Sequence, residues 1–110
     1  MVDRESGELG EPVVSRALTA EAADGTSVRL SLELWPPRPD PDPAGDWICP
    51  CRIAGLGEGA VWEIHGIDGL QAVQLALKVL QGQLDAAAEE RGLTFGWLGA
   101  EGLTADEIFA

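Results

Sequence analysis

The sequence predicts an α+β domain: an antiparallel four-stranded sheet in β-β-β-β-α order, with one long amphipathic helix packed on one face and a short C-terminal segment. Three observations predict this fold class. Short segments in which apolar and polar residues alternate precede one long segment with helical periodicity. Turns containing glycine or proline separate the short segments. The 110 residues suffice for one domain with its own core.

The N-terminal residues are polar and acidic. Residues 1–11 contain few apolar side chains, which predicts a flexible acidic tail ahead of a single domain over residues 12–110. Within this domain, residues 36–46 are rich in proline, which cannot donate hydrogen bonds to a sheet and favours an extended backbone. We expect this segment to be a stiff, exposed connector.

The first two strands are predicted to form a hairpin. Residues 13–20 carry the first strand and Ser27–Trp35 the second, in which leucines alternate with polar residues. This alternation predicts one buried and one mostly solvent-exposed face. The dipeptide Asp24-Gly25 between the two segments is a strong hairpin signal.

A second hairpin is predicted over Asp46–Leu56 and Ala60–His65, which a glycine-rich turn joins. Pro50 lies within the first of these segments and lacks a backbone N–H, which predicts an edge position or a bulge. Alternation places four side chains of this strand on one face: Trp47, Cys49, Cys51 and Ile53.

One long amphipathic helix follows the second hairpin. Asp68 is the predicted N-cap, and Gln71 three residues later completes the pattern of a capping box. Arg91 followed by Gly92 predicts the C-terminal end of the helix. Apolar residues recur at spacings of three and four and predict a buried stripe, which Leu75 and Ala76 widen: Leu70, Val73, Leu77, Leu80 and Leu84.

The C-terminal segment contains two further signals. Leu93–Leu98 is apolar enough for a short fifth strand or a packed loop. Thr104 and Glu107 have the spacing of a capping box, which predicts a single helical turn near residue 108.

The charge balance excludes some classes of partner. Seven Lys and Arg against nineteen Asp and Glu give a formal net charge of −12 and an isoelectric point near 4.2. Such a surface repels phosphate backbones and anionic membranes, so we expect neither nucleic acid nor membrane as a partner, while basic proteins are attracted. No apolar run reaches the length of a membrane helix and the first residues do not resemble a signal peptide, so we expect a cytoplasmic protein.

Cys49, Cys51 and His65 are the weak candidates for a metal or thiol site. A closed zinc site needs four ligands, usually with about two to four residues between its cysteines, whereas one residue separates these two. Strand geometry points both thiols to one face without converging them for a disulfide. We interpret the cysteines as reduced, buried side chains and His65 as a strand-end histidine, and we expect no catalytic residue, metal or cofactor.

Trp35 lies on the polar side of its strand, away from the leucines. One helix covers only one face of a sheet, so Trp35 lies on the face without a helix. We expect a patch here that either Leu93–Leu98 or a partner covers. The partner-binding candidates on this patch are Trp35, Arg29 and Glu33.

Two segments resemble the motifs of a family of short uncharacterised bacterial proteins, a domain of unknown function. The first segment reads Trp47-Ile-Cys49-Pro50-Cys51-Arg52-Ile53-x-Gly55-Leu56, and the second reads Gly66-Ile-Asp68-Gly-Leu70-Gln71-Ala72 and continues to Leu77. The resemblance extends over most of the predicted fold. The family has no assigned activity, so the resemblance implies no catalytic residue. Cys51 stands where the family pattern has an aromatic residue.

The function that these observations favour is a non-catalytic protein-interaction module, immunity-like or inhibitor-like, that binds a basic protein partner. Two alternatives stay open. One is a thiol- or metal-dependent protein that uses Cys49, Cys51 and His65. The other is a homo-oligomeric structural domain, such as a homodimer, in which Trp35 or the strand edge at Pro50 pairs with its mate.

Overall fold

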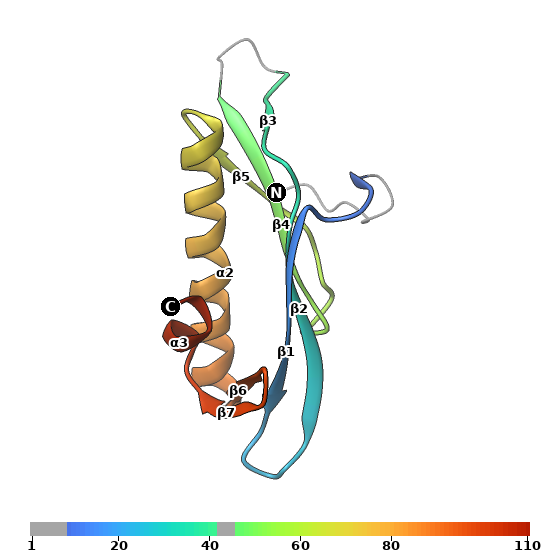
Figure 1. Ribbon diagram of the computed structural model, residues 1–110, viewed down its shortest axis with the longest axis vertical. Coiled ribbons are helices and arrows are strands. Elements are labelled where there is room, and N and C mark those ends of the chain that lie inside the picture. The colour runs from blue at the N-terminus through green and yellow to red at the C-terminus, as the bar shows by residue number, and fades with distance from the viewer. Residues whose placement is uncertain (1–8, 42–45) are drawn as a thin grey trace.

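An antiparallel β-sheet carries two helices on one of its faces (Figure 1). The computed structural model describes residues 9–41 and 46–110. The α+β class is confirmed, but within the described residues the sheet has seven strands rather than four, and a second helix follows the long one. The elements follow the order β1 (Val14–Glu21), β2 (Ser27–Leu34), β3 (Arg38–Pro39), β4 (Trp47–Ala54), β5 (Trp62–Gly66), α2 (Gly69–Arg91), β6 (Thr94–Trp97), β7 (Ala100–Leu103) and α3 (Ala105–Phe109).

The strand order is β3-β4-β2-β1-β6-β7, and β5 pairs with β4. Strands β2 and β3 follow one another along one edge of β4, while β5 occupies the other edge. The predicted hairpin at Asp24-Gly25 is confirmed, because β1 pairs with β2 along its whole length. Gly25 has a φ of 88°, and the backbone N–H of Thr26 donates to Asp24 Oδ1 at 2.9 Å. This is the turn chemistry that a short hairpin loop requires.

The prediction that Pro50 marks an edge or a bulge is wrong. β4 lies between two neighbours, with Glu63 of β5 opposite Pro50 and β2 on the other side. Nitrogen and carbonyl of one strand residue point to the same side, and the Pro50 carbonyl accepts a hydrogen bond from the Trp35 N–H at 3.0 Å. The Pro50 nitrogen therefore faces Trp35, just beyond the end of β2, and the second hydrogen bond of this pair is missing because proline has no N–H.

The strands missing from the sequence prediction are short. β3 has two residues and lies in the proline-rich segment, so this segment is in part a strand that pairs with β4 rather than only a connector; residues 42–45 of it lie outside the described residues. Leu93–Leu98 contributes β6, which forms a hairpin with β7. Segments of two or four residues contain too little alternation for a periodicity argument.

Both helices begin at the predicted residues. Asp68 caps α2 by accepting a hydrogen bond from the Gln71 backbone N–H at 2.8 Å. The helix ends at Gly92, whose φ of 65° is a left-handed conformation that glycine adopts without strain. Thr104 and Glu107 form a complete capping box at the start of α3. Local side-chain chemistry therefore determines where these helices begin and end.

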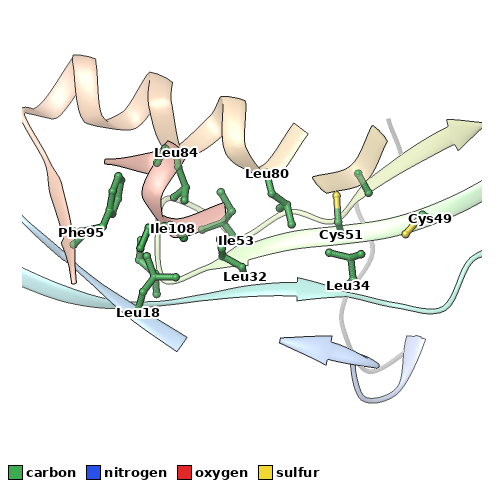
Figure 2. Packing of buried hydrophobic residues seen from close by; sticks show 14 of the residues in the cluster. Leu18, Leu32, Leu34, Cys49, Cys51, Ile53, Leu80, Leu84, Phe95 and Ile108 are labelled. Atoms are coloured by element: carbon green, nitrogen blue, oxygen red, sulfur yellow. The ribbon is translucent and has the colours of Figure 1, made fainter. Parts of the chain in front are cut away.

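The core fills the space between the sheet and the two helices (Figure 2). Ala76, Leu80 and Leu84 of α2 are fully buried as predicted, but the buried stripe continues through Ala72 and Ala87 rather than through Leu70 and Leu77, which are exposed. The small alanines allow α2 to approach the sheet closely. The fully or nearly fully buried cluster comprises Leu18, Ala20, Leu30, Leu32, Leu34, Cys49, Cys51, Ile53, Ala72, Ala76, Leu80, Leu84, Phe95, Ala105 and Ile108.

Arg16 connects β1 to the C-terminal part of the chain. Its guanidinium lies 3.9 Å from the centroid of the Trp97 ring and donates a hydrogen bond to the backbone carbonyl of Ile108 in α3. A cation near the C-terminal carbonyls of a helix and over an aromatic face is stabilised by both. Arg16 therefore has an internal structural role on the helix side of the sheet.

Candidate functional site

One half of the second face of the sheet, opposite the helices, is covered by the chain itself. Trp35, Ile48 and Val61 are buried there over β4 and β5, and only 1% of Trp35 is exposed. Strand alternation places all three side chains on the side away from α2, because their strand neighbours Leu34, Cys49 and Trp62 face the helix. Trp35 is therefore covered within the chain, and this burial leaves it unavailable as a partner-binding residue.

The residues that cover Trp35 are not those considered from the sequence. The Trp35 ring donates its Nε1–H to the backbone carbonyl of Gly10 at 3.0 Å, and the guanidinium of Arg52 lies 5.5 Å from the ring centroid. Val13 returns beside the end of β2 through a hydrogen bond to Leu34 at 2.8 Å, which brings the preceding residues over Trp35. Leu93–Leu98 instead joins the sheet beside β1. Gly10, placed in the tail by sequence, is thus part of the packed structure, and residues 1–8 lie outside the described residues.

The residues that the structure describes leave the other half of the second face open. We define the uncovered face as Ser15, Ala17 and Thr19 of β1 together with Arg29, Ser31 and Glu33 of β2, which pair across the hairpin. The first four are exposed and the last two are partly buried. Both helices lie on the opposite side of the sheet in Figure 1.

The remaining partner-binding candidates differ in availability. Arg29 is exposed on the uncovered face. Glu33 binds the Arg52 guanidinium through its Oε1 at 2.8 Å, and Ser31 Oγ donates to its Oε2 at 3.4 Å. Because its carboxylate already has two partners, Glu33 contributes less free charge to this face than Arg29.

An open groove of about 450 Å³ runs along the uncovered face. Ala17, Thr19 and Arg29 line one side, and the turn of the β6–β7 hairpin lines the other. Leu98 at this turn is 84% exposed and has a φ of 51°. A leucine in the left-handed region is strained, and the exposed Leu98 side chain contributes no stabilisation through burial. No local pattern in the sequence indicates this feature, because it depends on the pairing of β6 with β1.

The thiols and the histidine do not meet. Cys49 and Cys51 face the helix side and are fully buried, whereas His65 lies on the other side of the sheet and is about half exposed. The Cys49 thiol contacts the Trp35 carbonyl at 3.6 Å. No group of three or more possible metal ligands occurs within residues 9–41 and 46–110. The geometry in the described part of the chain therefore gives no shared site for these three residues.

Burial makes both thiols weak acids. Desolvation raises the pKa of Cys49 from 9.0 to about 11; desolvation, together with the neighbouring Cys49, raises the pKa of Cys51 to about 12. We expect both thiols to resist a thiol-specific reagent at pH 8 in the folded protein and to react after unfolding, because thiolate is the reactive form. Rapid labelling of the folded protein would contradict this burial.

The same pKa values predict an alkaline loss of stability. Between pH 9 and pH 11–12 the folded state binds more protons than the unfolded state, so the free energy of unfolding decreases as the pH rises through this window. Below pH 9 this contribution is fully present. Urea titrations at pH 8 and pH 10.5 measure the effect, and a Cys49→Ala/Cys51→Ala variant is the control that should lack it.

His65 has a partner that the sequence did not indicate. Its Nδ1 lies 3.6 Å from Asp40 Oδ2, and next to it Arg38 forms an ion pair with Glu63 at 2.7 Å. β3 and β5 flank β4 from opposite edges, which brings these residues together on the side away from the helices. Asp40 is distant from His65 in the sequence, and the pairing of the two-residue β3 that brings it close has no recognisable sequence pattern.

Together these features define an α+β domain with a helix-covered antiparallel sheet and an open region over β1 and β2. Residues 14–106 match the family model described as Domain of unknown function (DUF6968), and the chain belongs to this family. No curated protein and no solved structure matches the chain in the same comparisons. None of the described helices is long and apolar enough to cross a membrane.

Proposed function

We propose that this protein is a non-catalytic interaction module that binds a basic protein partner through the uncovered face. The observation that carries the proposal is the asymmetry of the second face: the half over β4 and β5 is covered by the chain itself, while the half over β1 and β2 is open and adjoins a groove of about 450 Å³. An open sheet face beside a groove is a surface that a partner can contact with little movement of the backbone.

The charge selects the class of partner. A formal net charge of −12 on 110 residues creates a long-range field that attracts basic proteins and repels acidic ones. A bacterial, cytoplasmic protein with an immunity-like or inhibitor-like role fits this combination of small size, acidity and an open sheet face. The motif resemblance described from the sequence supports the bacterial assignment.

The alternative based on Cys49, Cys51 and His65 has weaker support. The two thiols are buried with raised pKa values, and the imidazole lies on the opposite side of the sheet. The homodimer alternative at the Pro50 strand edge also loses its basis, because β4 has neighbours on both sides.

The test is affinity capture with two charge-matched variants. Ala17→Arg places a long cation on the uncovered face, and Gln74→Arg places the same side chain on the exposed surface of α2. We expect the wild type and Gln74→Arg to retain a basic partner at about 50 mM salt and Ala17→Arg to lose it, with binding weakened at high salt. Recovery of the same partner by both variants, or of none by the wild type, would contradict the proposal.

A further inference from the structure

We propose that residues 14–18 of β1 are an acceptor edge to which an extended, basic segment of the partner adds as a β-strand. This inference rests on the function proposed above, because it specifies how the same region would hold its partner. Its basis is the geometry of one strand edge and of the two grooves that flank it.

The edge is unpaired because β6 leaves β1 early. β6 pairs with Thr19, Ala20 and Glu21 but with no residue before them. The chain turns away at Leu98 and Gly99, which have φ values of 51° and 84°. No other strand of the described residues pairs with this side of β1. Half of β1 therefore has a neighbour on one side only.

The register shows which backbone groups point outward. At the hairpin end, the Ala22 N–H donates to the Thr26 carbonyl at 2.8 Å, so even-numbered residues of β1 hydrogen-bond with β2. Backbone groups alternate in direction along an antiparallel strand. The N–H and C=O groups of Ser15 and Ala17 therefore point away from β2, and both residues are exposed. Unpaired groups of this kind are the template for strand addition.

Grooves lie on both sides of this edge. On the helix side, an apolar groove of about 250 Å³ lies between β1 and α2, and in it Val14 is 57% and Leu77 39% exposed. On the other side lies the groove beside Leu98. Side chains of an added strand would alternate between the two grooves, which gives pockets for specificity in addition to backbone hydrogen bonds.

Charge decides between a basic segment and a second copy of this chain. Two copies, each with a net charge of −12, repel one another, whereas a lysine- or arginine-rich strand is attracted. Of the cations beside this edge, Arg16 is already engaged by Trp97 and the Ile108 carbonyl, and the exposed Arg29 lines the second groove together with Glu101. The attraction of a basic strand therefore comes from the net charge of the chain, and the apolar groove on the helix side favours apolar residues at alternate positions.

The probe for this proposal is a synthetic heptapeptide in which lysine and valine alternate, with a glutamate–valine peptide as the charge control. We expect the basic peptide to bind the wild-type protein at low salt and the acidic peptide not to bind. On binding, hydrogen exchange at the Ser15 and Ala17 amides should slow by at least about tenfold, because these N–H groups become hydrogen-bonded. Equal binding of the acidic peptide would overturn the assignment to a basic partner.

Two substitutions at Ala17 separate strand addition from contact with the face alone. Ala17→Pro removes the outward N–H and keeps a small side chain at an edge where proline is tolerated, whereas Ala17→Val keeps the N–H. We expect Ala17→Pro to weaken peptide binding at least about tenfold and Ala17→Val to change it less than about threefold. Thermal unfolding of each variant verifies the fold.

The outcomes distinguish this inference from the proposed function. If Ala17→Arg abolishes capture of the basic partner while Ala17→Pro binds as well as the wild type, the uncovered face is the binding site and strand addition is overturned. Unchanged exchange at Ser15 and Ala17 in the wild-type complex also overturns strand addition, without any variant. If the wild type binds neither a basic partner nor the basic peptide, the proposed function itself fails.

Discussion

Replacing Leu80 with alanine is expected to lower the free energy of unfolding by about 2–5 kcal/mol. Leu80 is fully buried in α2, where its side chain meets the sheet in the core of Figure 2. Truncation removes apolar contacts and leaves a cavity that a well-packed interior fills only in part. In a domain of this size the melting temperature should fall by roughly 10 °C or more.

Leu77→Ala is the matched control for this substitution. Leu77 lies almost one turn earlier in the same helix and is 39% exposed, so the same truncation removes less buried surface. Its loss should be less than half of that for Leu80→Ala. Equal losses in urea titrations of the two variants would mean that α2 does not face the sheet through the stripe containing Ala76, Leu80 and Leu84.

Replacing Gly55 with alanine is the second substitution with a large expected effect. Gly55 follows β4 and has a φ of 96°, and a Cβ there would lie 2.2 Å from the backbone carbonyl oxygen of Arg29. Left-handed strain and a clash with backbone act together, so we expect a loss of about 2–4 kcal/mol. The clash lies at the point where β4 separates from β2, so relief requires movement of a strand.

Gly57→Ala separates the two causes. Gly57 also has a positive φ, 67°, but a Cβ there would meet no atom within 4 Å. We expect about 1 kcal/mol for the backbone strain alone. If denaturant titrations gave the same loss for both variants, the close approach of Gly55 to β2 would not contribute to stability.

The parts of the fold that the sequence predicted are those determined by local chemistry. Alternation in Ser27–Leu34, the hairpin at Asp24-Gly25 and the caps at Asp68 and Thr104 each depend on residues a few positions apart. The four-stranded count was wrong because the additional strands are too short for periodicity, and because their pairing is long-range. Thr19 pairs with Gly96, and no local pattern connects residues so far apart in the chain.

In the candidate site, too, the sequence predicted what local alternation determines and missed what tertiary contacts determine. Alternation correctly placed Arg29, Glu33 and Trp35 on the side away from the leucines, but it did not identify what covers Trp35. What covers Trp35 is the backbone near Gly10, a tertiary contact that composition cannot reveal. The free edge of β1 was equally hidden, since it follows from where β6 ends rather than from any residue in β1.

The position of α2 explains why only part of the sheet is available. Gly66 in β5 allows the first turn of α2 to approach, since a Cβ there would lie 2.4 Å from the Ala72 backbone nitrogen. This contact ties α2 to β4 and β5. The helix side of β1 near Val14 is then left partly exposed, and on the second face the described residues cover only the region around Trp35. Both open regions meet at the unpaired edge of β1.

The claim that the uncovered face is the binding surface is tested most directly by measuring how strongly the captured basic partner binds Ala17→Arg and Gln74→Arg. The two variants have the same net charge and differ only in the side of the sheet that carries the new arginine. If the uncovered face is the binding surface, Ala17→Arg should bind at least about tenfold more weakly than Gln74→Arg, which should match the wild type. Equal affinities of the two variants, or a loss confined to Gln74→Arg, would contradict the claim.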